Sequence, residues 1–210
     1  MQDITLTEFC NSLSKFVVSA EGNLSYKTEN GFCIKQSGTP IKECIFIECD
    51  NDGNPYDQQT RPSIETGFHA LIYKNTDYKF IAHTHPINTL KILCSDLVEE
   101  FASNRLFPDQ VVFNGVYSCV VPYATPGDKL TNEISKIIKL KPRLILLKNH
   151  GIICCSYSKR EAIAMTEVCE KSAEIMLGAK QFGNPIYLTE KQITEIQNHK
   201  GEVYRNDNLR

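Results

Sequence analysis

Hydrophobic residues recur every three or four positions over residues 6–17, a spacing that predicts an amphipathic helix. The pattern then changes to short apolar runs separated by turn residues. Residues 24–27 and 32–36 flank a polar Asn-Gly turn and predict a β-hairpin, and residues 45–49 predict another strand that ends at an acidic turn. The first quarter of the chain therefore combines one helix with antiparallel strands.

The remaining chain alternates strands with helices. Residues 116–121 read as a strand, and helices are expected after Pro62 and Pro86. Ser158 through Glu161 forms a capping box that predicts a long helix to about residue 178, and a second box from Thr189 to Gln192 predicts a shorter one. Hairpins mixed with helices favour an α/β fold with a mixed, largely antiparallel sheet covered by helices.

Composition places the chain among ordinary globular proteins. With 210 residues, 41% hydrophobic content and a net charge of -2, it is expected to form one domain, residues 1–210. Lysine and arginine are dispersed, so no nucleic-acid partner is expected. No apolar run reaches the length of a membrane span, and the first residues lack the features of a secretory signal, so a cytoplasmic protein without membrane contact is expected.

Nine cysteines lie in or beside apolar segments and show no paired framework. We therefore expect buried, reduced thiols rather than disulfides. Cys154 and Cys155 are adjacent in a predicted strand, so their side chains face opposite ways and do not suit one metal ion.

Two histidines, His83 and His85, are separated by a single threonine at the end of a predicted strand that Pro86 terminates. Residues i and i+2 of a strand point the same way, about 6.6 Å apart along the backbone. Such a pair can share a metal ion, although the same spacing also occurs on a polar sheet face. Its place at a strand end favours a site, because neighbouring loops can supply further ligands.

A third imidazole is available at His150, where the apolar run of residues 143–147 ends in Asn-His-Gly. A histidine at a glycine-marked turn is exposed at the edge of a sheet. Three imidazoles with one open position suit catalytic zinc, whereas structural zinc sites usually have four protein ligands. Manganese, cobalt and iron also bind imidazole sites, so the sequence does not fix the metal.

A carboxylate accompanies these histidines. The proline and serine at positions 62 and 63 predict a helix start that places Glu65 in the first turn, where a carboxylate is stabilised by the helix dipole whatever its function. His69 lies four residues later on the same predicted face and can pair with it. For His69 we favour a structural role that supports the site.

Six short motifs occur in an order that resembles the class II aldolase/adducin family, and the likeness extends to about residue 180. The motifs are Gly22-Asn23-Leu24-Ser25, Ser37-Gly38-Thr39-Pro40, Pro62-Ser63-Ile64-Glu65, His83-Thr84-His85-Pro86, Pro122-Tyr123-Ala124-Thr125-Pro126-Gly127 and Asn149-His150-Gly151. The resemblance implies a single-domain, three-layer α-β-α fold. It also implies that His83, His85 and His150 bind one Zn²⁺ per subunit and that Glu65 is the acid/base residue.

The activity implied by this resemblance is reversible cleavage of a small ketose or ketose 1-phosphate. The products would be a dihydroxyacetone or dihydroxyacetone phosphate fragment and an aldehyde, formed through a zinc-stabilised enediolate. A dehydratase or decarboxylase of the same fold is an alternative. A sugar-phosphate 4-epimerase is disfavoured, because such epimerases usually have aspartate where this chain has Glu65. A non-catalytic, adducin-like interaction domain is the alternative from another class.

The resemblance also implies a phosphate site made of Asn23, Ser37, Gly38 and Ser63, whose small groups would hold an anion as loops and helix ends do. By themselves these residues would be explained by turn formation. The chain departs from the family pattern at Ala20 and Ile64, where hydroxyl residues are often found. The phosphate on the substrate is therefore left open, with a slight preference for a phosphorylated ketose.

Family members are commonly homotetramers in which a neighbouring subunit can contribute an aromatic hydroxyl that protonates the leaving aldehyde oxygen. Tyr117, Tyr123 and Tyr204 are candidates for this role, and no motif assigns it to one of them. The simpler expectation is core packing for Tyr117 and Tyr123 and surface exposure for Tyr204.

Overall fold

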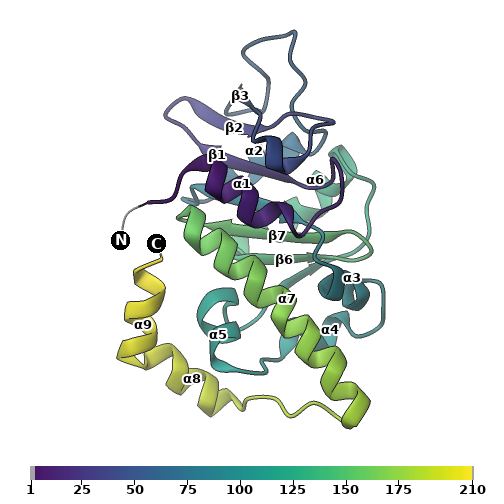
Figure 1. Ribbon diagram of the computed structural model, residues 1–210, viewed down its shortest axis with the longest axis vertical. Coiled ribbons are helices and arrows are strands. Elements are labelled where there is room, and N and C mark those ends of the chain that lie inside the picture. Colours follow the sequence, from purple (N-terminus) through teal and green to yellow (C-terminus); the bar gives the residue numbers. More distant parts are fainter. Residues whose placement is uncertain (1–2, 210) are drawn as a thin grey trace.

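The computed structural model describes residues 3–209 and contains a seven-stranded sheet in the order β3-β2-β1-β4-β7-β6-β5 (Figure 1). Only β5 and β6 pair in parallel, so the expected mixed, largely antiparallel sheet is confirmed. The strands are β1 Asn23–Lys27, β2 Gly31–Lys35, β3 Phe46–Asp50, β4 Phe80–Thr84, β5 Cys119–Val121, β6 Leu144–Leu147 and β7 Gly151–Ser156.

Helices cover both faces of the sheet and complete the expected three layers (Figure 1). Helices α1 and α7 pack on one face, with α3, α4 and α5 beside α7, whereas α2 and α6 pack on the other. The helices are α1 Leu6–Ser14, α2 Thr66–Asn75, α3 Ile87–Leu93, α4 Val98–Ser103, α5 Pro108–Asn114, α6 Asp128–Ser135, α7 Lys159–Phe182, α8 Glu190–Asn198 and α9 Lys200–Asp207, with short 3₁₀ turns η1 Ile41–Glu43 and η2 Ile138–Leu140.

The period-two alternation of strand β7 divides its side chains between two hydrophobic cores. Cys154 packs into the core under α1 and α7, and Cys155 packs into the core under α2 and α6. The two thiols therefore face opposite ways, as the sequence predicts. Burial in these cores raises the pKa of both thiols, which keeps them protonated and poor as ligands.

Both predicted helix starts near the carboxyl end are present, but they are built differently. Thr189 and Gln192 form the reciprocal capping box of α8. At α7 the Ser158 hydroxyl accepts from the Glu161 N–H, yet the Glu161 carboxylate accepts from Arg143 at 2.7 Å and from the Tyr157 N–H at 2.6 Å. Helix α7 also continues to Phe182, four residues beyond the expected end.

The expectation of reduced cysteines is wrong at one pair. Cys10 on α1 and Cys44 after η1 form a disulfide, with their Cα atoms 5.7 Å apart and 34 residues apart in sequence. Sequence reasoning missed this pair because only the tertiary packing of α1 on η1 brings the two thiols together. The other seven cysteines are free thiols; five of them are buried as expected, whereas Cys33 is half-buried and Cys94 is exposed.

Helices α8 and α9 follow the end of α7 and pack against α5 (Figure 1). Together with α5 and the first residues of β5 and β6 they line a solvent-open cavity of about 470 Å³, whose walls include Val112, Tyr117 and Arg143. Among the helices of residues 3–209, none combines the length and the apolar character that a membrane crossing requires.

The disulfide generates a stability prediction. Replacing Cys44 with serine opens a loop of 34 residues, and the chain-entropy argument then predicts a loss of about 3–4 kcal/mol in the free energy of unfolding. Urea denaturation without reductant should show this loss, and the exposed free thiol variant Cys94→Ser should denature like the parent. Nine reactive thiols in the unreduced, denatured protein would show that the disulfide does not form.

Candidate metal centre and active site

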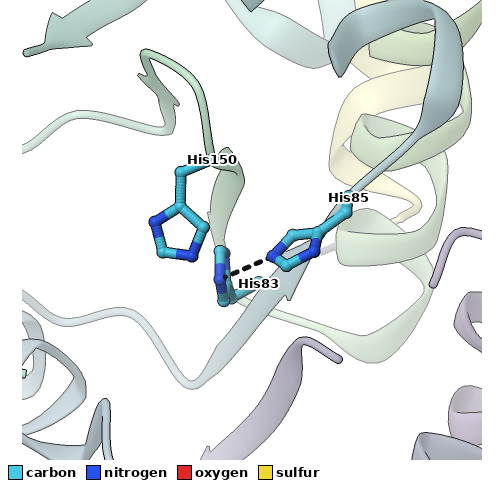
Figure 2. Close-up of side chains that lie close together, drawn as sticks. All are labelled: His83, His85 and His150. Carbon is cyan, nitrogen blue, oxygen red and sulfur yellow. Dashed lines mark hydrogen bonds between the residues drawn. The ribbon is translucent and has the colours of Figure 1, made fainter. Parts of the chain in front are cut away.

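Three histidines meet at one end of the sheet (Figure 2). His83 is on β4 and faces α2, His85 follows the end of that strand, and His150 lies in the turn between β6 and β7. One nitrogen from each ring lies within 4.8 Å of the others. The structure thus brings together the three residues that the sequence singles out.

The spacing of these nitrogens fits a small divalent cation. Nε2 of His83 and Nε2 of His85 are 3.2 Å apart. Two ligands at about 2.05 Å from a tetrahedral zinc ion are about 3.3 Å apart. The rings of His85 and His150 are tilted by 60° with their centroids 5.2 Å apart, so the three rings surround one point rather than stacking. The donor set therefore suits a divalent metal with an open coordination position.

The outer nitrogens of two rings have partners that orient them. Nδ1 of His83 donates to the carbonyl of Ile152 at 2.9 Å, so Nε2 is the nitrogen that a metal would bind, in place of the proton that Glu65 favours there. Nδ1 of His85 lies 3.4 Å from a carboxylate oxygen of Glu21. Sequence analysis missed Glu21, because only the fold brings the loop before β1 to the end of β4. Nδ1 of His150 is buried with no hydrogen-bond partner among residues 3–209.

The turn that carries His150 depends on one residue with an unusual backbone conformation and on one with no side chain. Asn149 has a φ of 56°, a left-handed conformation that asparagine tolerates better than most residues. Gly151 is needed for space, because a Cβ there would lie 2.5 Å from Cδ2 of His85 and 2.5 Å from the carbonyl oxygen of Thr84. The ring of His85 is therefore packed directly on the Gly151 backbone.

Glu65 lies beside the histidines, but not in the first turn of a helix as expected. It is the residue before α2, which begins at Thr66, and its side chain makes no capping hydrogen bond. Instead Oε2 lies 3.2 Å from Nε2 of His83, and Oε1 lies 3.5 Å from Nε2 of His150. The side chain is buried, and Oε1 has no hydrogen-bond partner among the described residues.

Burial and charge give the site its protonation states. Burial, followed by repulsion from His83, lowers the pKa of His85 and of His150 to about 4, so both rings are neutral near pH 7. Burial opposes the charge on Glu65, but His83, His150 and Asn23 outweigh it and hold the pKa of that carboxyl well below its usual range. The same attraction overcomes burial at His83 and raises its pKa.

The four residues expected at the phosphate site lie in adjoining segments. The turn after β2 carries Ser37 and Gly38, and the Ser37 N–H donates to the Arg61 carbonyl at 2.8 Å. The Ser63 N–H donates to the Lys35 carbonyl at 3.0 Å. The Ser63 hydroxyl accepts from the Glu65 N–H at 3.3 Å. Asn23 also lies here, but its amide is directed at Glu65 and His69.

A buried cation lies under the same loops. Lys35 is only 3% exposed, and its ammonium donates to the carbonyls of Ala20 and Thr39 at 3.1 and 2.5 Å. These contacts join the loop before β1 to the turn that carries Ser37 and Gly38. Burial lowers the pKa of Lys35, with an opposing attraction from Glu65. Sequence analysis missed this residue because a lysine at a strand end normally reaches solvent.

The candidate tyrosines are all exposed, which corrects the expected core packing of two of them. Tyr117 is 53% and Tyr123 is 60% exposed, and Tyr204 is exposed as expected. Tyr123 lies two residues after the end of β5, whose last residue Val121 pairs with Leu147 at the end of the sheet that carries His150. Tyr117 precedes β5 and lines the cavity under α8 and α9 instead.

The sequence profile of the Class II Aldolase and Adducin N-terminal domain matches residues 6–177, and the chain belongs to this family. An L-fuculose phosphate aldolase of Methanocaldococcus jannaschii is 30% identical over 167 residues, which cover 78% of this chain and 87% of that protein. A 3-oxo-tetronate 4-phosphate decarboxylase of Escherichia coli K12 is 30% identical over 193 residues, 87% of each chain.

Solved structures agree with this assignment. An L-fuculose 1-phosphate aldolase superposes with a TM-score of 0.80 at 25% identity, covering 91% of this chain and 92% of the other. The fold is therefore that of the class II aldolases. Relatives with two different reactions, at equal identity, show that membership of the family does not by itself select one.

The three histidines generate a metal-content prediction. His83→Ala should reduce bound divalent metal from about one per chain to near zero, because two imidazoles rarely retain zinc that three hold. Elemental analysis of protein purified without chelator measures this. The matched control is His199→Ala, since His199 is exposed and lies outside the cluster. Full metal content in the His83 variant would rule out this site.

A second prediction concerns the close contact at Gly151. Gly151→Ala places a methyl group against His85 and the Thr84 carbonyl, so His85 must move, and metal affinity should fall by about 10–100-fold, the range seen when supporting contacts of ligands are lost. Competition with a fluorescent chelator measures the affinity. Gly178→Ala is the control, because a Cβ there meets no atom of residues 3–209 within 4 Å. Equal affinity in both variants would show that the packing does not orient His85.

Proposed function

We propose that this protein is a metal-dependent carbon–carbon lyase that reversibly cleaves a small phosphorylated ketose into a dihydroxyacetone phosphate fragment and an aldehyde. The observation that supports this most strongly is a buried carboxylate oxygen, Oε1 of Glu65, that has no hydrogen-bond partner among residues 3–209 and lies beside three convergent imidazoles. His83, His85 and His150 would hold the metal, for which zinc fits the donor set. The metal would supply Lewis-acid polarisation of a substrate carbonyl.

Glu65 has the position and charge that proton transfer requires. In cleavage, the fragment that keeps the bonding electron pair must gain a proton at carbon, and in synthesis the same carbon must lose it. Asn23 anchors Oε2 of Glu65 through a 2.7 Å hydrogen bond, so Oε1 is the oxygen left to carry the proton. The low pKa of Glu65 favours the ionised form, which is the base in the synthetic direction.

A phosphorylated substrate is supported by the loops beside Glu65. Asn23, Ser37, Gly38 and Ser63 would surround the phosphate, and the buried ammonium of Lys35 adds a positive charge beneath them. The missing hydroxyl at Ile64 removes one contact, and Ile64 is exposed instead. Both relatives described above carry phosphate in the names of their substrates, which points the same way.

Decarboxylation of a phosphorylated 3-oxo acid is the second candidate. The decarboxylase relative matches 87% of this chain, against 78% for the aldolase relative, at the same identity. Its chemistry needs the same carbonyl polarisation, and the carbon that loses carbon dioxide also takes up a proton. A dehydratase, an epimerase and a non-catalytic interaction domain are the remaining outcomes that the assays below separate.

We also propose that the working form is a homo-oligomer, a tetramer as in the family, acting in the cytoplasm. Tyr123 is exposed at the end of the sheet that carries His150, so a neighbouring subunit could present it to a second active site. Tyr117 and Tyr204 are less suited, because Tyr117 lines the cavity at the other end of β5 and Tyr204 lies on α9.

Glu65→Gln tests the proposed chemistry. The amide keeps the shape of the carboxylate and cannot act as a base, so kcat should fall by about 10²–10⁴-fold while bound metal is retained. The assay follows aldehyde release from a panel of phosphorylated and free ketoses, and carbon dioxide release from phosphorylated 3-oxo acids. The control is Glu29→Gln, in an exposed turn.

The outcomes separate the candidates. Metal-dependent carbon dioxide release without ketose cleavage would replace the aldolase with the decarboxylase. Bound metal without either reaction would direct the search to dehydration or epimerisation, and protein that binds no metal would favour the interaction domain. Full turnover in Glu65→Gln would exclude Glu65 as the proton carrier.

A further inference from the structure

A continuous chain of buried hydrogen bonds runs away from Glu65 between β1 and α2. Nδ2 of Asn23 is 2.7 Å from Oε2 of Glu65, and Oδ1 of Asn23 is 2.5 Å from Nε2 of His69. The Ser25 hydroxyl is 2.7 Å from Nδ1 of His69 and 2.7 Å from the hydroxyl of Tyr73. All five side chains are buried, and the last three are too far along the chain of contacts to touch a substrate held at the histidines.

This row of hydrogen-bonded side chains forms because the spacing of its residues along α2 matches the spacing along β1. On the helix side, every fourth residue contributes: Glu65 directly before α2, then His69 and Tyr73 within it. Four residues of helix correspond to about 6 Å per step. Asn23 and Ser25 are spaced by two residues on β1, which corresponds to about 6.7 Å. The two strand residues therefore fall between the three residues of the helix segment, and each one bridges its two neighbours.

The acceptor at one end fixes the direction of every hydrogen bond. An ionised carboxylate only accepts, so Asn23 must offer Glu65 its Nδ2–H and present its Oδ1 to His69. Oδ1 also only accepts, so Nε2 of His69 must carry the hydrogen. Burial, then repulsion from His83, lowers the pKa of His69 to about 3, so the ring is neutral and its Nδ1 accepts from Ser25. The Ser25 oxygen then accepts from the Tyr73 hydroxyl.

We propose that His69, Ser25 and Tyr73 are positioning residues that fix the orientation of the Asn23 amide and, through it, the Glu65 carboxylate. With the other tautomer of His69, the favoured amide orientation would turn Oδ1 of Asn23 towards Oε2 of Glu65, and two acceptors would face each other. The Nε2–H tautomer prevents that flip. This inference rests on the proposed function only where Glu65 is taken as the catalytic acid/base residue.

The first test measures the tautomer itself and needs no activity. Long-range ¹H–¹⁵N spectra of ¹⁵N-histidine-labelled protein should show His69 as a neutral ring protonated at Nε2, and His69→Gln identifies its signals. The Nδ1–H form or a charged ring at neutral pH would overturn the proposal. In Ser25→Ala the hydrogen bond to Nδ1 is lost, but Oδ1 of Asn23 still requires a donor, so His69 should keep its hydrogen at Nε2.

The second test is a double-mutant cycle on kcat, with the substrate that the panel identifies. His69→Phe keeps an aromatic ring and removes both nitrogen contacts, so kcat should fall by about 10–100-fold with KM and bound metal little changed. In an Asn23→Ala background the same change should have almost no further effect, because the amide that His69 orients is absent. Equal effects of His69→Phe in both backgrounds would show a merely structural role and overturn the proposal.

Two further variants extend the kcat experiment. His69→Gln can still donate to Asn23 and should recover part of kcat, and it replaces His69→Phe in the cycle if the latter does not fold. Tyr73→Phe removes only the outermost link and should change kcat by less than about threefold. Full activity of Glu65→Gln together with the expected His69 tautomer would contradict the proposed role of Glu65 in catalysis. The inference that His69 orients the Asn23 amide would still hold.

Discussion

The antiparallel pairing of β4 with both β1 and β7 is the constraint on which the site depends. The β1 register places Asn23 opposite His83, and the β7 register places Ile153 opposite the same histidine. On one side His83 therefore donates from Nδ1 to the Ile152 carbonyl of β7. On the other side its Nε2 lies 3.2 Å from the Glu65 oxygen that accepts from Asn23. A shift by one residue in either pairing would turn His83 into the other core and separate the three imidazoles.

Burying Glu65 sets the second condition, because a carboxylate removed from water must be matched by donors or cations. Here His83 and Asn23 share Oε2, while Oε1 has no hydrogen-bond partner among residues 3–209. This difference between the two oxygens fits the proposed role of Glu65 in proton transfer, because a carboxylate with all its hydrogen bonds satisfied would be stable but unreactive. The neutral rings of His85 and His150 keep lone pairs available for a cation, and its charge would then offset the buried carboxylate.

Sequence patterns predicted most of the fold and the residues that converge. The strand hairpin, the long helix after Ser158 and the turn at His150 depend on local signals, and the structure has all three. The missed features are contacts between distant segments: the Cys10–Cys44 disulfide, the approach of Glu21 to His85 and the burial of Lys35. Glu65 was expected in the first turn of its helix but precedes that turn, because Pro62 marks the turn before α2 rather than its first residue.

Shared geometry explains why one family supports several reactions. A metal held by the three imidazoles would supply carbonyl polarisation, and the Glu65 carboxylate would carry a proton. Both C–C cleavage and decarboxylation need those two elements. On the proposed function, the choice between them would depend on which substrate bond is aligned with the polarised carbonyl, and the loops around Ser37, Ser63 and the exposed Ile64 would control that alignment. If Glu65 is the proton carrier, the hydrogen bond from Asn23 to Oε2 would add to this selection, because Oε1 would then approach the substrate carbon from one direction.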